Sequence, residues 1–119
     1  MSDTAQASNL QLHQAGSNAS IIDIRGQVTA ATESALMDAY ARATASGAKT
    51  VLLNFTNLEY MNSSGIGLLV TLLNRANRQG QKIAAFGLSD HYKDIFELTR
   101  LDEAIKIYDD EAAALAASS

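Results

Sequence analysis

The order of apolar and polar positions along the chain predicts strands that alternate with helices. Leu10 and Leu12 alternate with polar residues, as do Ile22 and Ile24, and this pattern is typical of half-buried strands. The turn signal at residues 15–18 between them indicates a hairpin. Three later apolar runs predict further strands, and the first of them lacks alternation, as expected where both faces of a strand are covered. These runs are residues 50–55, 82–86 and 104–108.

Helical spacing and capping residues predict helices between these strands. Thr29 is a suitable N-cap for the first helix, and Gly47 supplies the left-handed residue that commonly follows a last turn. The second helix is expected to begin near Ser63 or Ser64 and to end before Gly80. Its apolar residues are numerous, so it is expected to pack on the sheet.

Two shorter helices complete the pattern. Ser89 or Asp90 is expected to cap the third helix, and Asp109 and Asp110 open a final alanine-rich helix with the acidic start that the helix dipole favours. The element order predicts a single α/β (α+β) domain, with a mixed, mostly parallel sheet of about five strands and about four helices. We expect residues 1–8 to be a flexible tail and residues 9–117 to form the domain.

Composition and charge exclude several classes of function. The net charge is -4, and the nine Lys and Arg residues are scattered, whereas nucleic-acid binding needs a clustered basic face. Without cysteine the chain can form no disulfide and no thiolate zinc site. The start of the sequence lacks the features of a signal peptide, and no apolar run approaches the roughly 20 residues of a membrane span. We therefore expect a cytoplasmic protein that binds neither nucleic acid nor membrane.

Motifs for catalysis, metals and nucleotides are weak. The elbow Gly-x-Ser-x-Gly of serine hydrolases is absent, and the two isolated histidines, His13 and His91, have no ligand spacing for a metal. The segment Gly65-Ile66-Gly67 starts a dinucleotide motif, but Val70 stands where its third glycine belongs. We expect no enzyme, no catalytic residue, no metal site and no cofactor.

Two adjacent serines lie where a predicted strand leads into the second helix. Unpaired N–H groups and the positive end of the helix dipole favour a phosphate on a serine at such a place. Asn and Ser are also the preferred N-cap residues, so the same residues have a purely structural reading. The segment is Tyr60-Met61-Asn62-Ser63-Ser64-Gly65-Ile66-Gly67.

From about Ile21 to Tyr108 the chain resembles the STAS family, the anti-sigma factor antagonists of bacteria. The resemblance rests on the strand at residues 51–55, the serine segment, the leucine-rich helix after it and the strand at residues 82–86. It implies the same fold as the apolar pattern. One departure is clear: the family usually has aspartate before the serines, and this chain has Asn62.

The resemblance implies a switch protein with protein partners. Such a protein binds an anti-sigma factor that is also a serine kinase of the GHKL type, and thereby frees the sigma factor. Phosphorylation of the first serine after the Asp or Asn, here Ser63, abolishes binding, and a PP2C-type phosphatase restores it. We expect Ser64 to be less available because it enters the first helical turn.

Helical geometry predicts which side of the second helix meets the partner. At about 100° per residue, one face collects apolar residues for the core. That face contains Ile66, Leu69, Val70, Leu73 and Ala76. Leu68 then points outward, and an apolar residue beside a modifiable serine suggests a partner surface. The expected partner-binding residues are Asn62, Ser63, Ser64, Gly65, Gly67, Leu68, Thr71 and Arg75.

Two other classes of function remain open. One is a STAS-type interaction module of a transport complex or a sensory assembly. The other is a small-molecule or nucleotide binder that uses the serine segment as its anion site.

Overall fold

The computed structural model of the chain describes residues 10–15, 18–45 and 47–118, and the expected tail at residues 1–8 lies outside these ranges. The strands are β1 (Leu10–Gln14), β2 (Ala19–Ile24), β3 (Gly26–Val28), β4 (Thr50–Asn54), β5 (Leu58–Met61), β6 (Lys82–Phe86) and β7 (Lys106–Tyr108). The helices are the 3-10 turns η1 (Ala30–Thr32) and η2 (Leu101–Glu103), and the α-helices α2 (Glu33–Ala45), α3 (Ser63–Arg78), α4 (Asp90–Leu98) and α5 (Glu111–Ser118).

The main sheet confirms the predicted fold class. It has five strands in the order β1-β2-β4-β6-β7, in which β1 and β2 form an antiparallel hairpin and every later neighbour is parallel. The central strand β4 buries Val51, Leu52 and Leu53 completely, so both of its faces are covered, as its unbroken apolar run predicts. The last strand is shorter than predicted, because residues 104 and 105 follow η2 and only Lys106–Tyr108 pair with β6.

A second, two-stranded parallel sheet joins β3 to β5, and no pattern in the sequence predicts it. Gly26 starts β3 and has a positive φ of 70°. The pairing brings Val28 opposite Met61, the last residue of β5. Segments of three and four residues are too short to show alternation, and their pairing depends on contacts made far apart in the sequence.

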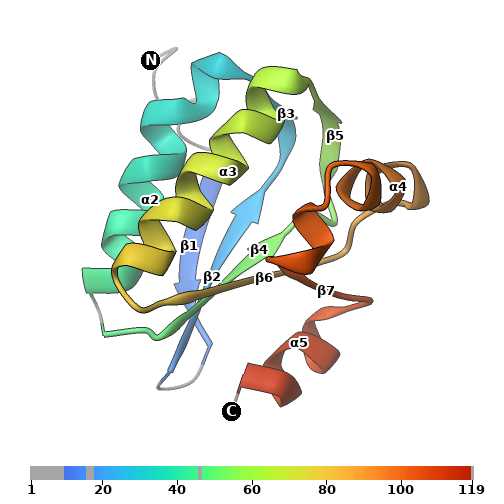
Figure 1. Ribbon diagram of the computed structural model, residues 1–119. Coiled ribbons are helices and arrows are strands. Elements are labelled where there is room, and N and C mark those ends of the chain that lie inside the picture. Colours follow the sequence, from blue (N-terminus) through green and yellow to red (C-terminus); the bar gives the residue numbers. More distant parts are fainter. Residues whose placement is uncertain (1–9, 16–17, 46, 119) are drawn as a thin grey trace.

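The sheet separates two unequal layers (Figure 1). Helices α2 and α3 lie side by side across one face, and the larger apolar core lies between that face and α2, α3 and α4. Helix α5 packs on the opposite face, where a smaller cluster joins Ala114 to Ile21, Leu52, Ala84 and Phe86. The other face therefore has only one short helix over it among the described residues.

Capping side chains fix the helix starts where the sequence predicts them. The Thr29 hydroxyl accepts a hydrogen bond from the Ala31 N–H, and η1 then continues into α2. Ser89 caps α4 by accepting from the Tyr92 N–H, and Asp110 accepts from the Ala113 N–H at the start of α5. Gly47 has a φ of 93° after α2, which confirms its predicted left-handed conformation.

Candidate functional site

The two serines lie where β5 leads into α3, with β3 and α4 on either side. We call residues 61–65 the serine junction; it contains the end of β5, the N-cap of α3 and the first turn of α3. Strand β3 runs beside β5 on one side, and α4 approaches from the other (Figure 1). Residues that are distant in the sequence therefore determine how the serines are presented.

Asn62 is the N-cap of α3. Its backbone is extended, with φ −95° and ψ −175°, and its side-chain Oδ1 accepts a hydrogen bond of 3.0 Å from the Gly65 N–H. Its own N–H donates to the Val28 carbonyl of β3 at 3.3 Å. The cap role predicted for Asn62 is thus confirmed, and the same residue ties the helix start to the small second sheet.

Ser63 and Ser64 are the first two residues of α3, and both are exposed. Neither hydroxyl makes a hydrogen bond within residues 10–15, 18–45 and 47–118. Ser64 lies in the first helical turn, as expected, but Ser63 does so too, and both residues are exposed. Accessibility alone therefore does not distinguish the two hydroxyls as sites of modification.

Gly65 is buried, because α3 approaches β3 very closely at this residue. A Cβ atom at position 65 would lie 2.4 Å from the Val28 carbonyl oxygen and 2.7 Å from the Met61 side chain. Only glycine permits this distance between helix and strand. Gly65 was expected to contact a partner, but its burial gives it a structural role in positioning the junction.

Tyr92 of α4 holds the junction from the other side. Its hydroxyl oxygen accepts a hydrogen bond of 2.8 Å from the Met61 N–H, and its side chain is 7% exposed. Nothing in the sequence signals this contact, which spans 31 positions. The hydroxyl satisfies a backbone N–H that would otherwise lack a partner at the end of β5.

The predicted orientation of α3 is wrong at two positions, Leu68 and Val70. Leu68 was expected to point outward, but it is 7% exposed and belongs to the main core, together with Gly65, Leu69, Leu72 and Ala76 on the same face. Val70 was expected in the core, but it is 42% exposed. Leu69 and Ala76 are fully buried, as predicted, and Ile66 and Leu73 are partly buried against the core.

The outward face of α3 continues from the serines. Ser63, Gly67, Val70 and Asn74 are exposed and follow one another at spacings of four, three and four residues, so they form one stripe along the helix. Tyr60 precedes the junction and is 49% exposed. We call these five residues the serine face.

Thr71 and Arg75 are engaged within the fold. The Thr71 hydroxyl donates to the Gly67 carbonyl at 3.1 Å, and the Arg75 guanidinium lies 5.9 Å from the centroid of the Tyr40 ring on α2. Burial raises the pKa of the Tyr40 phenol, and the positive charge of Arg75 partly offsets this effect. The Tyr40 hydroxyl in turn donates to Gln81, so Arg75 stabilises the contact between α2 and the end of α3.

The electrostatics of α3 favour an anion at its start. The first turn contains no acidic residue, while Arg75 and Arg78 lie in the last turn, where they complement the negative end of the dipole. The positive end is therefore not neutralised by the helix's own side chains. The junction can hold a phosphate on a serine, but it contains no base to activate one for catalysis.

The two histidines contact side chains other than the serines. His13 of β1 places its Nε2 atom 3.2 Å from a carboxylate oxygen of Asp23, and the His91 ring on α4 meets the Tyr92 ring edge to face. Within the described ranges, no three His, Cys, Asp or Glu side chains gather closely enough to hold a metal ion. In the same ranges no helix has the length and apolar character to cross a lipid bilayer.

Comparison with known proteins identifies the family and a group of relatives. The family described as "STAS domain" matches residues 9–114. The anti-sigma-B factor antagonist of Staphylococcus aureus is 31% identical over 61 residues. That match covers 51% of this chain and 56% of the relative, so it spans about half the length of each protein.

Solved structures share the fold at low sequence identity. An anti-sigma factor antagonist from Mycobacterium paratuberculosis superposes with a TM-score of 0.78 and 17% identity, over 92% of each chain. The Bacillus cell fate determinant SpoIIAA in its phosphorylated form superposes with a TM-score of 0.69 and 19% identity, over 91% of this chain and 98% of that one. At these identities the likeness concerns the fold.

Proposed function

Because this chain belongs to the STAS domain family, we propose that it is an anti-sigma factor antagonist, a binding protein that serine phosphorylation switches off. The observation that carries the proposal is the pair of free, exposed hydroxyls on an uncharged first turn of α3. The relatives named as anti-sigma-B factor antagonists support the class of partner. The fold shared with SpoIIAA, a protein known in a phosphorylated form, supports the kind of switch.

The proposed partners are proteins. The chain binds an anti-sigma factor that is itself a serine kinase of the GHKL type, and the sigma factor bound to that kinase is released. The kinase phosphorylates Ser63, which ends the interaction, and a PP2C-type phosphatase removes the phosphate. This chain contributes no catalytic group to the cycle.

The switch needs no change of fold. A phosphate on Ser63 adds a charge of about −1.5 to −2 at pH 7, and the positive helix start tolerates it in the free protein. In a complex the same group would lie within a desolvated interface, where hydration of the phosphate is lost. If the phosphate raises the free energy of the complex by about 1.4 kcal/mol more than that of the free protein, the affinity for the partner falls tenfold.

The contact surface that we propose is the serine face, together with Asn62, Ser64 and Thr71. It differs from the surface expected from the sequence in two respects. Gly65 and Leu68 are removed because they are buried, and Arg75 is removed because it packs against Tyr40. Tyr60, Val70 and Asn74 are added because they are exposed near Ser63 or on the same face of α3. Exposed aromatic and aliphatic groups next to polar ones are characteristic of protein interfaces.

Ser63→Asp is expected to keep the fold and to weaken binding of the anti-sigma factor by about tenfold or more. A carboxylate at the start of a helix is neutral or stabilising, so the loss has to arise in the interface. Isothermal titration calorimetry with the purified anti-sigma factor measures the affinity, and circular dichroism measures the fold. Wild-type affinity for a folded Ser63→Asp protein would refute the proposed switch.

Ser64→Asp places the same charge one residue later within the same proposed contact surface, so it is also expected to weaken binding while keeping the fold. Mapping of the phosphate therefore has to distinguish the two serines. The kinase and ATP are then added to wild type, Ser63→Ala and Ser64→Ala, and mass spectrometry locates the phosphate. We expect phosphate on wild type and on Ser64→Ala, and none on Ser63→Ala. Phosphate found only on Ser64 would move the site by one residue.

Asn62→Asp is expected to leave stability within about 0.5 kcal/mol of wild type, because Asn and Asp are equally good N-caps. The Asn62 Nδ2 group makes no hydrogen bond within the described residues. In the aspartate variant an acceptor oxygen takes its place and can receive the proton of the Ser63 hydroxyl. We therefore expect faster phosphorylation, measured with the cognate kinase and radiolabelled ATP. Equal rates would mean that Asn62 is only a cap.

A further inference from the structure

A groove lies at the edge of the main sheet, beside the end of α3 that is farthest from the serines. It forms because β7 has only three residues and pairs with Ala84–Phe86, so the first half of β6 lacks a neighbour on that side. The groove has a volume of about 490 Å³, which is within the usual range for small-molecule sites. Asn77 of α3 borders it, about 20 Å from Ser63 at a rise of about 1.5 Å per residue.

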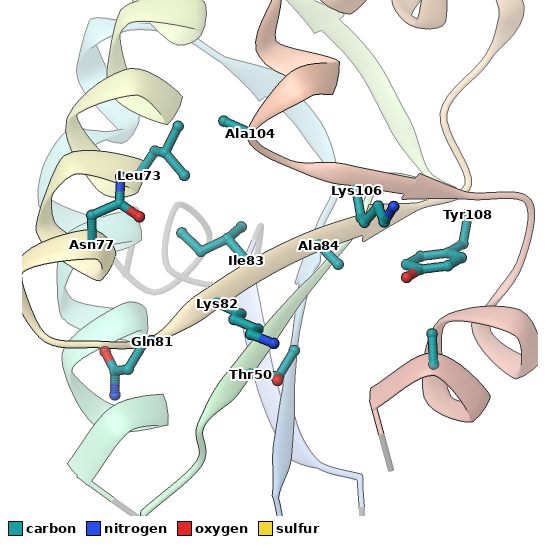
Figure 2. A pocket seen from close by; sticks show the side chains of 11 residues that line it. Thr50, Leu73, Asn77, Gln81, Lys82, Ile83, Ala84, Ala104, Lys106 and Tyr108 are labelled. Carbon is teal, nitrogen blue, oxygen red and sulfur yellow. The ribbon is translucent and has the colours of Figure 1, made fainter.

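The groove wraps around the edge of the sheet and has two different sides (Figure 2). On the α3 side the lining consists of the apolar Leu73, Ile83 and Ala104 together with the polar Asn77 and Gln81. On the α5 side the pairing register aligns Thr50 with Lys82 and Ala84 with Lys106, so these side chains project from the same face of the sheet. The Tyr108 hydroxyl is directed toward Ala84 from beyond Lys106 (Figure 2).

The charge in the groove is positive. The chain has four lysines, Lys49, Lys82, Lys93 and Lys106, and two of them line this groove. Among the described residues no aspartate or glutamate lines it. Within the described residues neither Lys82 nor Lys106 forms an ion pair, whereas Lys93 pairs with Asp109. Two unpaired ammonium groups beside two hydroxyls are a suitable environment for an anion in a protein whose net charge is −4.

Ala84 lies between Lys82 and Lys106, and its small side chain leaves space on the α5 side of the groove. Ala84 is 6% exposed, and Lys82 precedes it by two positions on β6 while Lys106 is its partner on β7. A larger side chain at position 84 would project into this space. Lys106 also borders a second hollow that contains Asp94, Glu97 and Asp102, so those carboxylates weaken its attraction for an anion. Lys82 is therefore expected to contribute more.

We propose that this groove binds a small organic anion, a molecule with an apolar body and one carboxylate or phosphate group. The acid group lies on the α5 side of the groove, which Lys82, Lys106, Thr50 and Tyr108 line. The apolar body lies along Leu73, Ile83 and Ala104. The site is independent of the proposed phosphorylation of Ser63, since the two lie at opposite ends of α3.

The test uses three probes on the full chain: phenyl phosphate, phenol and inorganic phosphate. Two-dimensional NMR of the ¹⁵N-labelled protein follows each titration up to millimolar concentrations. Phenyl phosphate is expected to shift the amides of Lys82, Ile83 and Lys106, and to bind more tightly than phenol or inorganic phosphate, because only it fills both sides of the groove. Shifts confined to the serine junction, or no shifts with phenyl phosphate, would overturn the proposal.

Charge variants identify the anion subsite. Lys82→Ala is expected to weaken phenyl phosphate binding by about tenfold, the effect of losing one charged hydrogen bond. Lys106→Gln is expected to have a smaller effect in the same direction. Lys49→Ala removes the same charge from an exposed lysine that does not line the groove, so it should bind as wild type. Equal affinities for Lys82→Ala, Lys106→Gln and Lys49→Ala would refute the site.

Discussion

Leu68→Glu is expected to destabilise the domain by about 3–5 kcal/mol, whereas Val70→Glu, two residues later, changes stability by less than about 1 kcal/mol. Leu68 is 7% exposed within the main core, so its replacement removes apolar packing and buries a carboxylate with no partner. Val70 is 42% exposed on the serine face, where a carboxylate stays hydrated. Denaturant unfolding followed by circular dichroism measures both effects.

The same pair of variants tests the serine face. Val70→Glu is expected to weaken binding of the anti-sigma factor by about tenfold, because a charge then replaces an apolar contact beside Ser63. Leu98→Glu is the matched control: Leu98 is 82% exposed on α4 and is not part of that face. Wild-type affinity of Val70→Glu for the anti-sigma factor would show that the partner binds outside the serine face. Equal loss of stability in Leu68→Glu and Val70→Glu would contradict the orientation of α3.

Gly65→Ala and Gly67→Ala are expected to change stability in opposite directions. A methyl group at position 65 meets the Val28 carbonyl oxygen at 2.4 Å, and that backbone atom can move away only if α3 shifts from β3. The cost of such overpacking is about 1–3 kcal/mol, and it exceeds the gain of about 1 kcal/mol from a better helix former. A Cβ atom at position 67 would meet no atom within 4 Å apart from its chain neighbours and the nearby backbone of its own helix. Alanine should therefore raise the free energy of unfolding by about 1 kcal/mol.

Denaturant titrations of the two glycine variants measure the free energy of unfolding of each. Gly65→Ala should also shift the NMR signals of Val28 and Asn62, because the Asn62 N–H donates to the same carbonyl. Gly67→Ala should leave the Val28 signal unchanged. If both alanines were stabilising, the close approach of α3 and β3 would not restrict the sequence at position 65.

Local sequence patterns were sufficient to predict those helices and strands whose formation depends mainly on their own residues. The alternation around Leu12 and Ile22 identifies the hairpin, and the continuous apolar run of β4 identifies a strand covered on both sides. Asn62 is a strong enough capping residue to fix the start of α3 within one position. These features made the fold class and the position of the serine junction predictable.

Contacts between distant segments were not predictable in the same way. The pairing of β3 with β5 and the hydrogen bond from the Met61 N–H to Tyr92 both connect segments about 30 residues apart. Neither has a composition or spacing that marks it in the sequence. Both act on the junction, so its detailed shape depends on the tertiary structure.

The sequence by itself determined the order of the elements, the class of the fold and the location of two serines at a helix start, because apolar periodicity and capping chemistry are local. Only the tertiary structure decided which side of α3 faces outward. Seven apolar residues between Ile66 and Ala76 cover more than half of the helix surface, so hydrophobicity alone permits several rotations. The close approach of Gly65 to Val28 selects one of them. That rotation buries Leu68 and exposes Val70 on the same face of α3 as Ser63.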